Sequence, residues 1–208
     1  MKTWFERLAI ILACSIVFGG GTFAYLTYVK GGLSFTTSHN ESSILAVRTK
    51  SVLSEMIKGN KTSYLRMDVQ SGKFQVVQNI IEDPKDVMVI FGDFNCPFCK
   101  RDEAKARSFA LSTGIESIYF IEAAILGQNS RDRALKSIAT WKFSPESYER
   151  SAFFDRKSKQ SHTPALEERV GEAGKILDSH LELVADARVT ATPTYIIEGK
   201  AHVGALKF

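Results

Sequence analysis

A strand, a closely spaced cysteine pair and a helix follow one another in the middle of the chain, and this succession constrains the fold more than any other feature. Residues 87–91, VMVIF, form an unbroken apolar run that is typical of a strand buried on both faces. Cys96 and Cys99 come next, and Pro97 between them suits the first position of a helix. We expect that helix to continue to Gly114, because glycine commonly ends helices.

Strand-forming segments after this helix predict an α/β fold. Residues 117–122, SIYFIE, indicate a second strand, so the succession becomes a right-handed strand–helix–strand crossover in a mainly parallel sheet. Near the end of the chain, residues 198–200, EGK, separate two β-rich stretches and predict a hairpin. Between these parts, apolar residues recur at helical spacing, so we expect a helical insertion at about 124–188 with Trp141 buried in it.

The preceding region predicts a small helix-plus-hairpin unit at residues 43–81. Its first part carries apolar residues at helical spacing up to Gly59, and two β-rich stretches then flank a short turn at residues 70–72, QSG. Such a unit can barely bury a core alone. We therefore expect it to pack against another surface, and a second copy of the chain, forming a homodimer, is one candidate.

An apolar segment near the N-terminus is long enough to cross a membrane. Residues 8–29 carry no charge, and as a helix they would span about 33 Å. We interpret them as a signal anchor in the inner membrane. The alternatives are a cleaved signal peptide, with TFA at 22–24 as the cleavage site, and a lipoprotein signal that uses Cys14. Each reading exports residues 31–208 to an oxidising compartment.

The sequence thus predicts five parts: a signal anchor or signal peptide at 1–30, a linker at 31–42, the helix-plus-hairpin unit at 43–81, a second linker at 82–86 and the α/β domain at 87–208. With 44% hydrophobic residues, the chain can bury a core without a disulfide staple. The net charge of +4 comes without a dense tract of lysine and arginine, which argues against a nucleic-acid partner.

The cysteine pair can be a reversible redox centre, a structural disulfide or part of a metal site. At a helix start, unpaired N–H groups and the positive end of the helix dipole favour a thiolate, so Cys96 is the expected nucleophile and Cys99 the resolving thiol. A static disulfide would close too short a loop to stabilise the fold much. The four scattered histidines argue against zinc, while a copper-carrying pair stays an alternative, and we expect no metal and no cofactor.

Thr192 and Pro193 directly precede an apolar stretch, TYII, that is expected to form a strand. A proline at such a place would ordinarily cost a hydrogen bond of the sheet. Because a strand and a cysteine pair lie upstream, we expect a cis peptide bond between these two residues.

Three stretches resemble the thioredoxin-fold disulfide oxidoreductases, and most of all the bacterial periplasmic disulfide isomerases DsbC and DsbG: residues 87–104, 114–122 and 187–204. The resemblance implies a thioredoxin-like domain with a helical insertion. It also implies that Cys96 attacks, that Cys99 resolves, and that Thr192 and Pro193 form a loop facing the sulfurs. In this family the backbone of that loop holds a substrate segment in extended form.

Residues beside the pair complete the candidate site. Phe94 is either an apolar platform for clients or a core residue, and Pro97 and Phe98 are expected to contact substrate. This Pro-Phe dipeptide tunes the redox potential, so oxidase, isomerase and reductase stay open. The charged neighbours are interpreted as capping or solvated residues: Asp93, Lys100 and Arg101.

The chain ends at Phe208, soon after the last expected strand. The C-terminal helix of a thioredoxin fold is therefore missing from the expected order of elements, and one face of the sheet must be covered in another way.

The function expected from these features is exchange of disulfides with envelope proteins in the bacterial periplasm, as an isomerase or reductase that is kept reduced by a thiol redox partner. The alternatives are a non-enzymatic docking component of an envelope assembly, such as a secretion or conjugation system, and a metallochaperone. Membrane attachment would run through residues 8–29.

Overall fold

The computed structural model describes residues 26–29, 32–35, 50–58, 62–154 and 164–204. The chain divides into two compact units, Met1–Ile44 and Leu45–Phe208. In the first unit, strands β1 (Leu26–Val29) and β2 (Gly32–Phe35) pair as an antiparallel hairpin.

This hairpin bears on the predicted membrane segment. The segment was expected to be helical to residue 29, but its last four residues form β1. Residues 8–25 lie outside the described residues, so the anchor stays a prediction. Within the described parts of the chain, no helix is both long and apolar enough to cross a bilayer.

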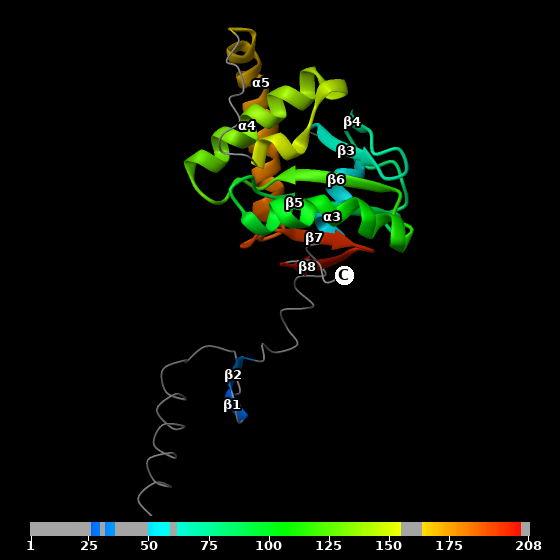
Figure 1. Ribbon diagram of the computed structural model, residues 1–208, viewed down its shortest axis with the longest axis vertical. Helices are drawn as coiled ribbons and strands as arrows, with labels where there is room; N and C mark the ends of the chain where they lie inside the picture. The colour runs from blue at the N-terminus through cyan, green and yellow to red at the C-terminus, as the bar shows by residue number, and fades with distance from the viewer. Residues whose placement is uncertain (1–25, 30–31, 36–49, 59–61, 155–163, 205–208) are drawn as a thin grey trace, which may run out of the picture. The chain divides into compact units, whose positions relative to one another are not determined.

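The second unit is built on one sheet of six strands in the order β4-β3-β6-β5-β7-β8. The strands are β3 (Tyr64–Asp68), β4 (Phe74–Val77), β5 (Val87–Gly92), β6 (Ser117–Glu122), β7 (Thr194–Ile197) and β8 (Lys200–Val203) (Figure 1). Only β5 and β6 pair in parallel among these strands, and the other neighbours are antiparallel. The crossover between β5 and β6 is thus confirmed, whereas the expectation of a mainly parallel sheet was wrong. Strands β3 and β7 flank the parallel pair in the antiparallel direction, and each continues into an antiparallel edge strand, β4 or β8.

The hairpin predicted around residues 70–72 is present, but it does not belong to a separate unit. Strand β3 pairs with β6, so β3 and β4 extend the main sheet. A helical segment at residues 50–58 also joins this core by burying Val52, Leu53 and Met56. The structure therefore merges the expected unit at 43–81 with the domain, and its burial requires no second copy of the chain.

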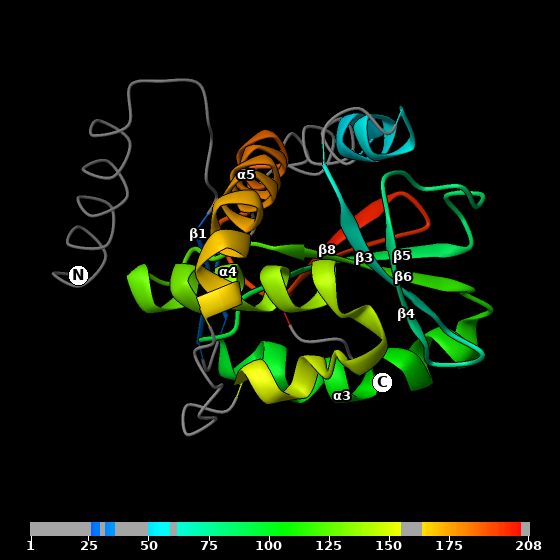
Figure 2. The same ribbon diagram turned by 90° about the horizontal axis from the view of Figure 1, so that it is seen from above.

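Besides the 50–58 helix, the described residues form α3 (Pro97–Thr113), α4 (Gln128–Phe143) and α5 (Pro164–Asp186), with short 3₁₀ helices η1 (Pro145–Ser147) and η2 (Arg150–Phe154) between α4 and α5. Helix α3 ends as predicted at Gly114, whose φ of 79° lies in the left-handed region that glycine adopts without strain. The expected helical insertion therefore consists of α4, η1, η2 and α5. Figure 2 shows α3 on one side of the sheet and the 50–58 helix on the other.

Side chains of the central strand alternate between two apolar clusters. Met88 and Ile90 face the cluster that contains α3 and α4, including Trp141, which is fully buried as predicted. Val89 and Phe91 face the cluster that contains the 50–58 helix and the end of α5. The unbroken apolar run of β5 is thereby explained, since both faces of the sheet are covered by helices of this unit.

His180 joins α5 to two strands inside the protein. Its Nδ1 accepts the backbone N–H of Glu122 at 3.2 Å, its Nε2 lies 3.1 Å from the carbonyl oxygen of Ser63, and its ring stacks on Tyr64. Burial lowers the pKa of His180 to about 4, because a charged imidazolium would lose its hydration there.

The buried imidazole makes a testable contribution to stability. The unfolded chain binds a proton at His180 below pH 6.5 and the folded chain only below about 4, so this stability is present above pH 6.5 and is lost as the pH falls towards 4. Between these values, wild type should lose about 3 kcal/mol of unfolding free energy relative to His180→Gln, as measured by urea denaturation at each pH. If the unfolding free energies of wild type and His180→Gln depend on pH to the same extent, His180 does not make this contribution to stability.

Candidate redox site

The two cysteines lie at the N-terminal end of α3. Cys96 is the N-cap residue, its Sγ accepts the backbone N–H of Cys99 at 3.3 Å, and Pro97 is the first residue of the helix. Both cysteines are free thiols and are buried, with 4% of Cys96 and 3% of Cys99 exposed. An N–H group donated to a sulfur stabilises negative charge on it, which is the arrangement that the sequence predicted for Cys96.

A loop from the far end of the sequence closes over this helix start. The Thr192–Pro193 peptide bond is cis, as expected, and the Cys96 thiol donates to the carbonyl oxygen of Thr192 with an Sγ–O distance of 3.1 Å. Strand register explains the contact. Phe91 near the end of β5 lies opposite Thr194 at the start of antiparallel β7, so the loop after one strand meets the loop before the other.

The two sulfurs differ in their surroundings. Burial raises the pKa of the Cys99 thiol, and charge on the neighbouring Cys96 raises it further. Cys99 therefore stays protonated near neutral pH, while the Cys96 sulfur accepts a hydrogen bond from the backbone N–H of Cys99. This asymmetry suits a chemistry in which Cys96 reacts first.

Asp93 organises the loop before the cysteines. Its carboxylate accepts the backbone N–H of Asn95 at 2.8 Å and of Leu126 at 2.9 Å, and also the hydroxyl of Ser130. The residue is 1% exposed, so the interpretation of Asp93 as solvated was wrong, although it does cap the turn at Asn95. Asp93 thus fixes the loop that carries Cys96 to the segment after β6.

A buried ion cluster lies under the same loop. The guanidinium of Arg150 pairs with the carboxylates of Glu122 and Glu103, and its carbon lies 4.8 Å from the ring centroid of Phe94. Burial raises the pKa of Glu103 to about 7, although the nearby Arg150 charge opposes this shift. Sequence reasoning missed this cluster because its members come from α3, β6 and η2, and no local pattern links them.

Asp102, one turn after Cys99, is a second buried acid that sequence reasoning missed. Its carboxylate accepts the hydroxyl of Tyr195 at 3.3 Å and the Nε–H of Arg101 at 3.0 Å. Tyr195 follows Pro193 by two residues, so this contact ties α3 to the strand after the cis peptide bond. The available signal in the sequence was the spacing. Residue 102 follows Cys99 by three positions and so lies on the same face of a helix, which is the buried face of α3.

The other predicted contact residues divide between surface and core. Pro97 is exposed, and Phe98 is 53% exposed with the Arg101 guanidinium over its ring. Phe94 is 3% exposed and packs against Phe153 and Phe154, so the structure places it in the core and not on a client-binding surface. Lys100 is exposed, like Arg101, in agreement with a solvated helix face.

Potential metal ligands do not gather around the sulfurs in the part of the chain that the structure describes. No group of three histidine, cysteine or acidic side chains there is placed to hold an ion. His180 is occupied in the core, His202 lies on β8, and the other two histidines fall outside the described residues.

Comparisons with known proteins agree with this architecture. The chain belongs to the family of thioredoxin-like domains, which matches residues 74–208. This confirms the predicted fold at the level of the family, whereas the narrower DsbC and DsbG type is not established by it. No curated protein sequence matches the chain significantly.

Solved structures with the same fold are distant in sequence. A linker-deletion mutant of Proteus mirabilis ScsC is 20% identical with a TM-score of 0.57, and the match covers 81% of this chain and 80% of that one. The thiol-disulfide exchange protein alpha-DsbA2 from Wolbachia pipientis is 17% identical with a TM-score of 0.54, covering 82% and 94%. The catalytic domain of Proteus mirabilis ScsC is 18% identical with a TM-score of 0.53, covering 76% and 91%. These likenesses support the thioredoxin-like fold.

The buried carboxylate of Asp93 should be needed for stability. Asp93→Ala leaves two backbone N–H groups without their acceptor and should lower the unfolding free energy by about 2–4 kcal/mol, as measured by urea denaturation. Asp83→Ala removes the same charge from a side chain that is 52% exposed and should change stability by less than about 0.5 kcal/mol. A similar effect of both changes would show that Asp93 does not organise the loop.

Proposed function

We propose that the protein is a thiol–disulfide oxidoreductase that exchanges disulfides with protein clients through Cys96 and Cys99. The observation that carries the proposal is the position of the Cys96 sulfur, between the N–H of Cys99 and the carbonyl of Thr192. A reactive thiol and a loop backbone able to hold an extended client segment lie together there. The wider likeness to a thiol-disulfide exchange protein agrees with this function.

The chemistry follows from the two sulfurs. The Cys96 thiolate attacks one sulfur of a client disulfide, forms a mixed disulfide and releases the other client sulfur as a thiolate. Cys99 then loses its proton and attacks the Cys96 sulfur, which releases the reduced client and leaves a Cys96–Cys99 disulfide. If a thiolate from a different cysteine of the client attacks the client sulfur of the mixed disulfide first, a rearranged client disulfide forms and Cys96 leaves as the thiolate with which it began.

The direction of exchange depends on what recharges the pair. We propose isomerisation or reduction, as in the DsbC and DsbG type, with a thiol redox partner that returns both sulfurs to thiols. The hairpin of the expected unit at 43–81 is part of the main sheet, so this direction is supported by the resemblance of the cysteine and cis-proline stretches to that type. A measured reduction potential near those of strong oxidants would favour oxidation instead.

Location and partners are proposed from the sequence. The uncharged segment at residues 8–29 supports export and anchoring in the inner membrane, with the second unit in the periplasm and envelope proteins as its clients. The modest net charge gives no support to a nucleic-acid partner. A homodimer stays a prediction without a structural requirement for it.

A docking component of an envelope assembly is the second candidate function. The observation that favours it is the burial of both sulfurs, because a reactive thiol must meet its client. In this function the domain binds a partner protein through its surface, and the cysteines only contribute to packing.

Replacing the cysteines separates the two functions. Cys99→Ala should accumulate mixed disulfides with envelope proteins, seen on non-reducing gels, because the resolving thiol is missing. Cys96→Ser should lower the rate of client disulfide reduction by about a thousandfold or more, because an alcohol replaces the nucleophilic thiol.

The double variant Cys96→Ser with Cys99→Ser tests the docking function, which requires neither thiol. If the host phenotype is still complemented by this variant and Cys99→Ala traps no client, the redox function is excluded and the docking function is favoured.

A further inference from the structure

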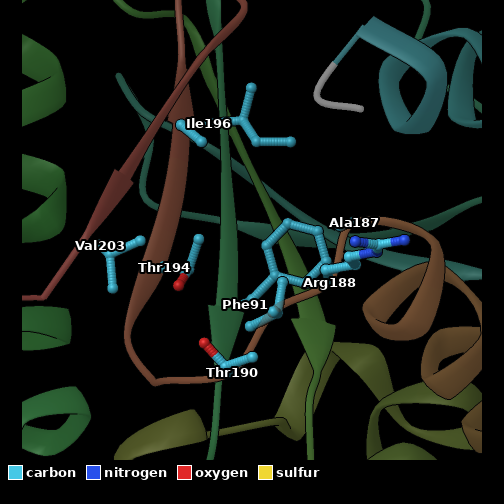
Figure 3. Close-up of a pocket in the computed structure, with 9 residues that line it drawn as sticks. Phe91, Ala187, Arg188, Thr190, Thr194, Ile196 and Val203 are labelled. Carbon is cyan, nitrogen blue, oxygen red and sulfur yellow. The ribbon is translucent and has the colours of Figure 1, made fainter. Parts of the chain in front are cut away.

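A small pocket opens on the face of the sheet opposite to α3, beside the cis peptide loop. It is lined by side chains of β5, β7 and β8 and by the turn after α5, among them Phe91, Arg188, Thr190, Thr194, Ala201 and Val203 (Figure 3). Phe91, Thr194 and Val203 are lateral neighbours across β5, β7 and β8, and Ile196 pairs with Ala201 in the next row. Their shared face makes an apolar floor.

The pocket adjoins the loop that covers the Cys96 sulfur. Its walls include Thr190 and Thr194, which stand on either side of the loop whose Thr192 carbonyl contacts Cys96. Thr190 and Thr194 are each two residues from Thr192, and two residues of chain span at most about 7 Å. A client peptide that runs beside this loop from Cys96 is therefore expected to reach the pocket within two or three residues.

The size of the pocket restricts its occupant. Its cavity volume is about 100 Å³. Pockets for whole small-molecule ligands usually measure about 300–1,000 Å³, and a cavity of about 150 Å³ holds a benzene molecule. The pocket is therefore large enough for one aliphatic side chain but too small for a whole small-molecule ligand.

Charge at the rim adds a second element of recognition. Arg188 is exposed in the turn after α5, and Figure 3 shows its side chain next to the ring of Phe91. No ion pair involves Arg188 among the described residues. A carboxylate beside the bound aliphatic side chain would complement this charge.

We propose that this pocket is a client subsite, which binds an aliphatic side chain two or three residues from the client cysteine and favours an acidic residue next to it. The inference deepens the proposed function and rests on it, because the peptide is held in place by exchange at Cys96. The pocket then supplies sequence preference, while the loop backbone supplies affinity for any extended segment.

Exchange kinetics with matched peptides test the subsite. The probes are mixed-disulfide peptides that carry Leu or Ser at the second and third positions on either side of the cysteine, together with hydroxyethyl disulfide as a substrate without side chains. Reduced wild type should react about tenfold faster with the best Leu peptide than with its Ser counterpart. Ala201→Phe fills the pocket and should abolish this preference, but should leave the rate with hydroxyethyl disulfide unchanged.

The same strand offers a matched control. His202→Phe places an aromatic ring at the residue that pairs with Tyr195, on the other face of β8, and should keep the preference for Leu. Arg188→Gln changes an exposed side chain and should remove a preference of about two- to threefold for Glu over Gln beside the Leu. Loss of the Leu preference in His202→Phe, or its survival in Ala201→Phe, would overturn the proposal.

A binding measurement separates failure of the subsite from failure of the redox function. Peptides with Ser in place of cysteine are added to the protein, and methyl NMR signals of Ile196 and Val203 are followed. Shifts with the Leu peptide but not with the Ser peptide support the subsite even if no disulfide is exchanged, in which case the redox function fails alone. Exchange without shifts and without a Leu preference leaves the redox function standing and excludes the subsite.

Discussion

The contact between the Cys96 sulfur and the Thr192 carbonyl is the interaction on which the rest of the site depends. It exists because β5 and β7 are neighbours in opposite directions, so the end of one lies beside the start of the other. The same arrangement places the first turn of α3, whose Cys99 N–H donates to the Cys96 sulfur, against the loop that carries the cis peptide bond. A helix start and a strand start thereby come together in one site.

Buried polar groups hold these two features in position. Asp93 fixes the loop before Cys96, and Asp102 joins α3 to Tyr195 on β7. Arg150 packs beneath Phe94 and pairs with acids from α3 and β6. Groups of this kind cost free energy to bury and recover it only when fully paired, so they stabilise one arrangement of the loops over the alternatives.

Local patterns were enough to predict β5, β6 and α3, because each depends on neighbours in sequence. The cis peptide bond at Pro193 was predicted from a proline before a strand together with the cysteine pair far upstream. The antiparallel pairing of β3 with β6 was not predictable in the same way, since the partner strand lies about fifty residues along the chain and alternation alone does not name it. Phe94 shows the same limit on a smaller scale. An apolar loop residue can face solvent or core, and its true partners, Phe153 and Phe154, belong to a distant 3₁₀ helix.

The sulfur of Cys96 and the carbonyl that covers it are 96 positions apart. The covering loop directly precedes β7, and β7 and β8 come last among the described elements. Because the chain leaves the ribosome or translocon from its N-terminus, both thiols emerge well before the loop that covers Cys96. During that interval the two sulfurs belong to an unfinished sheet, and Cys96 still lacks the carbonyl group that covers it in the folded protein.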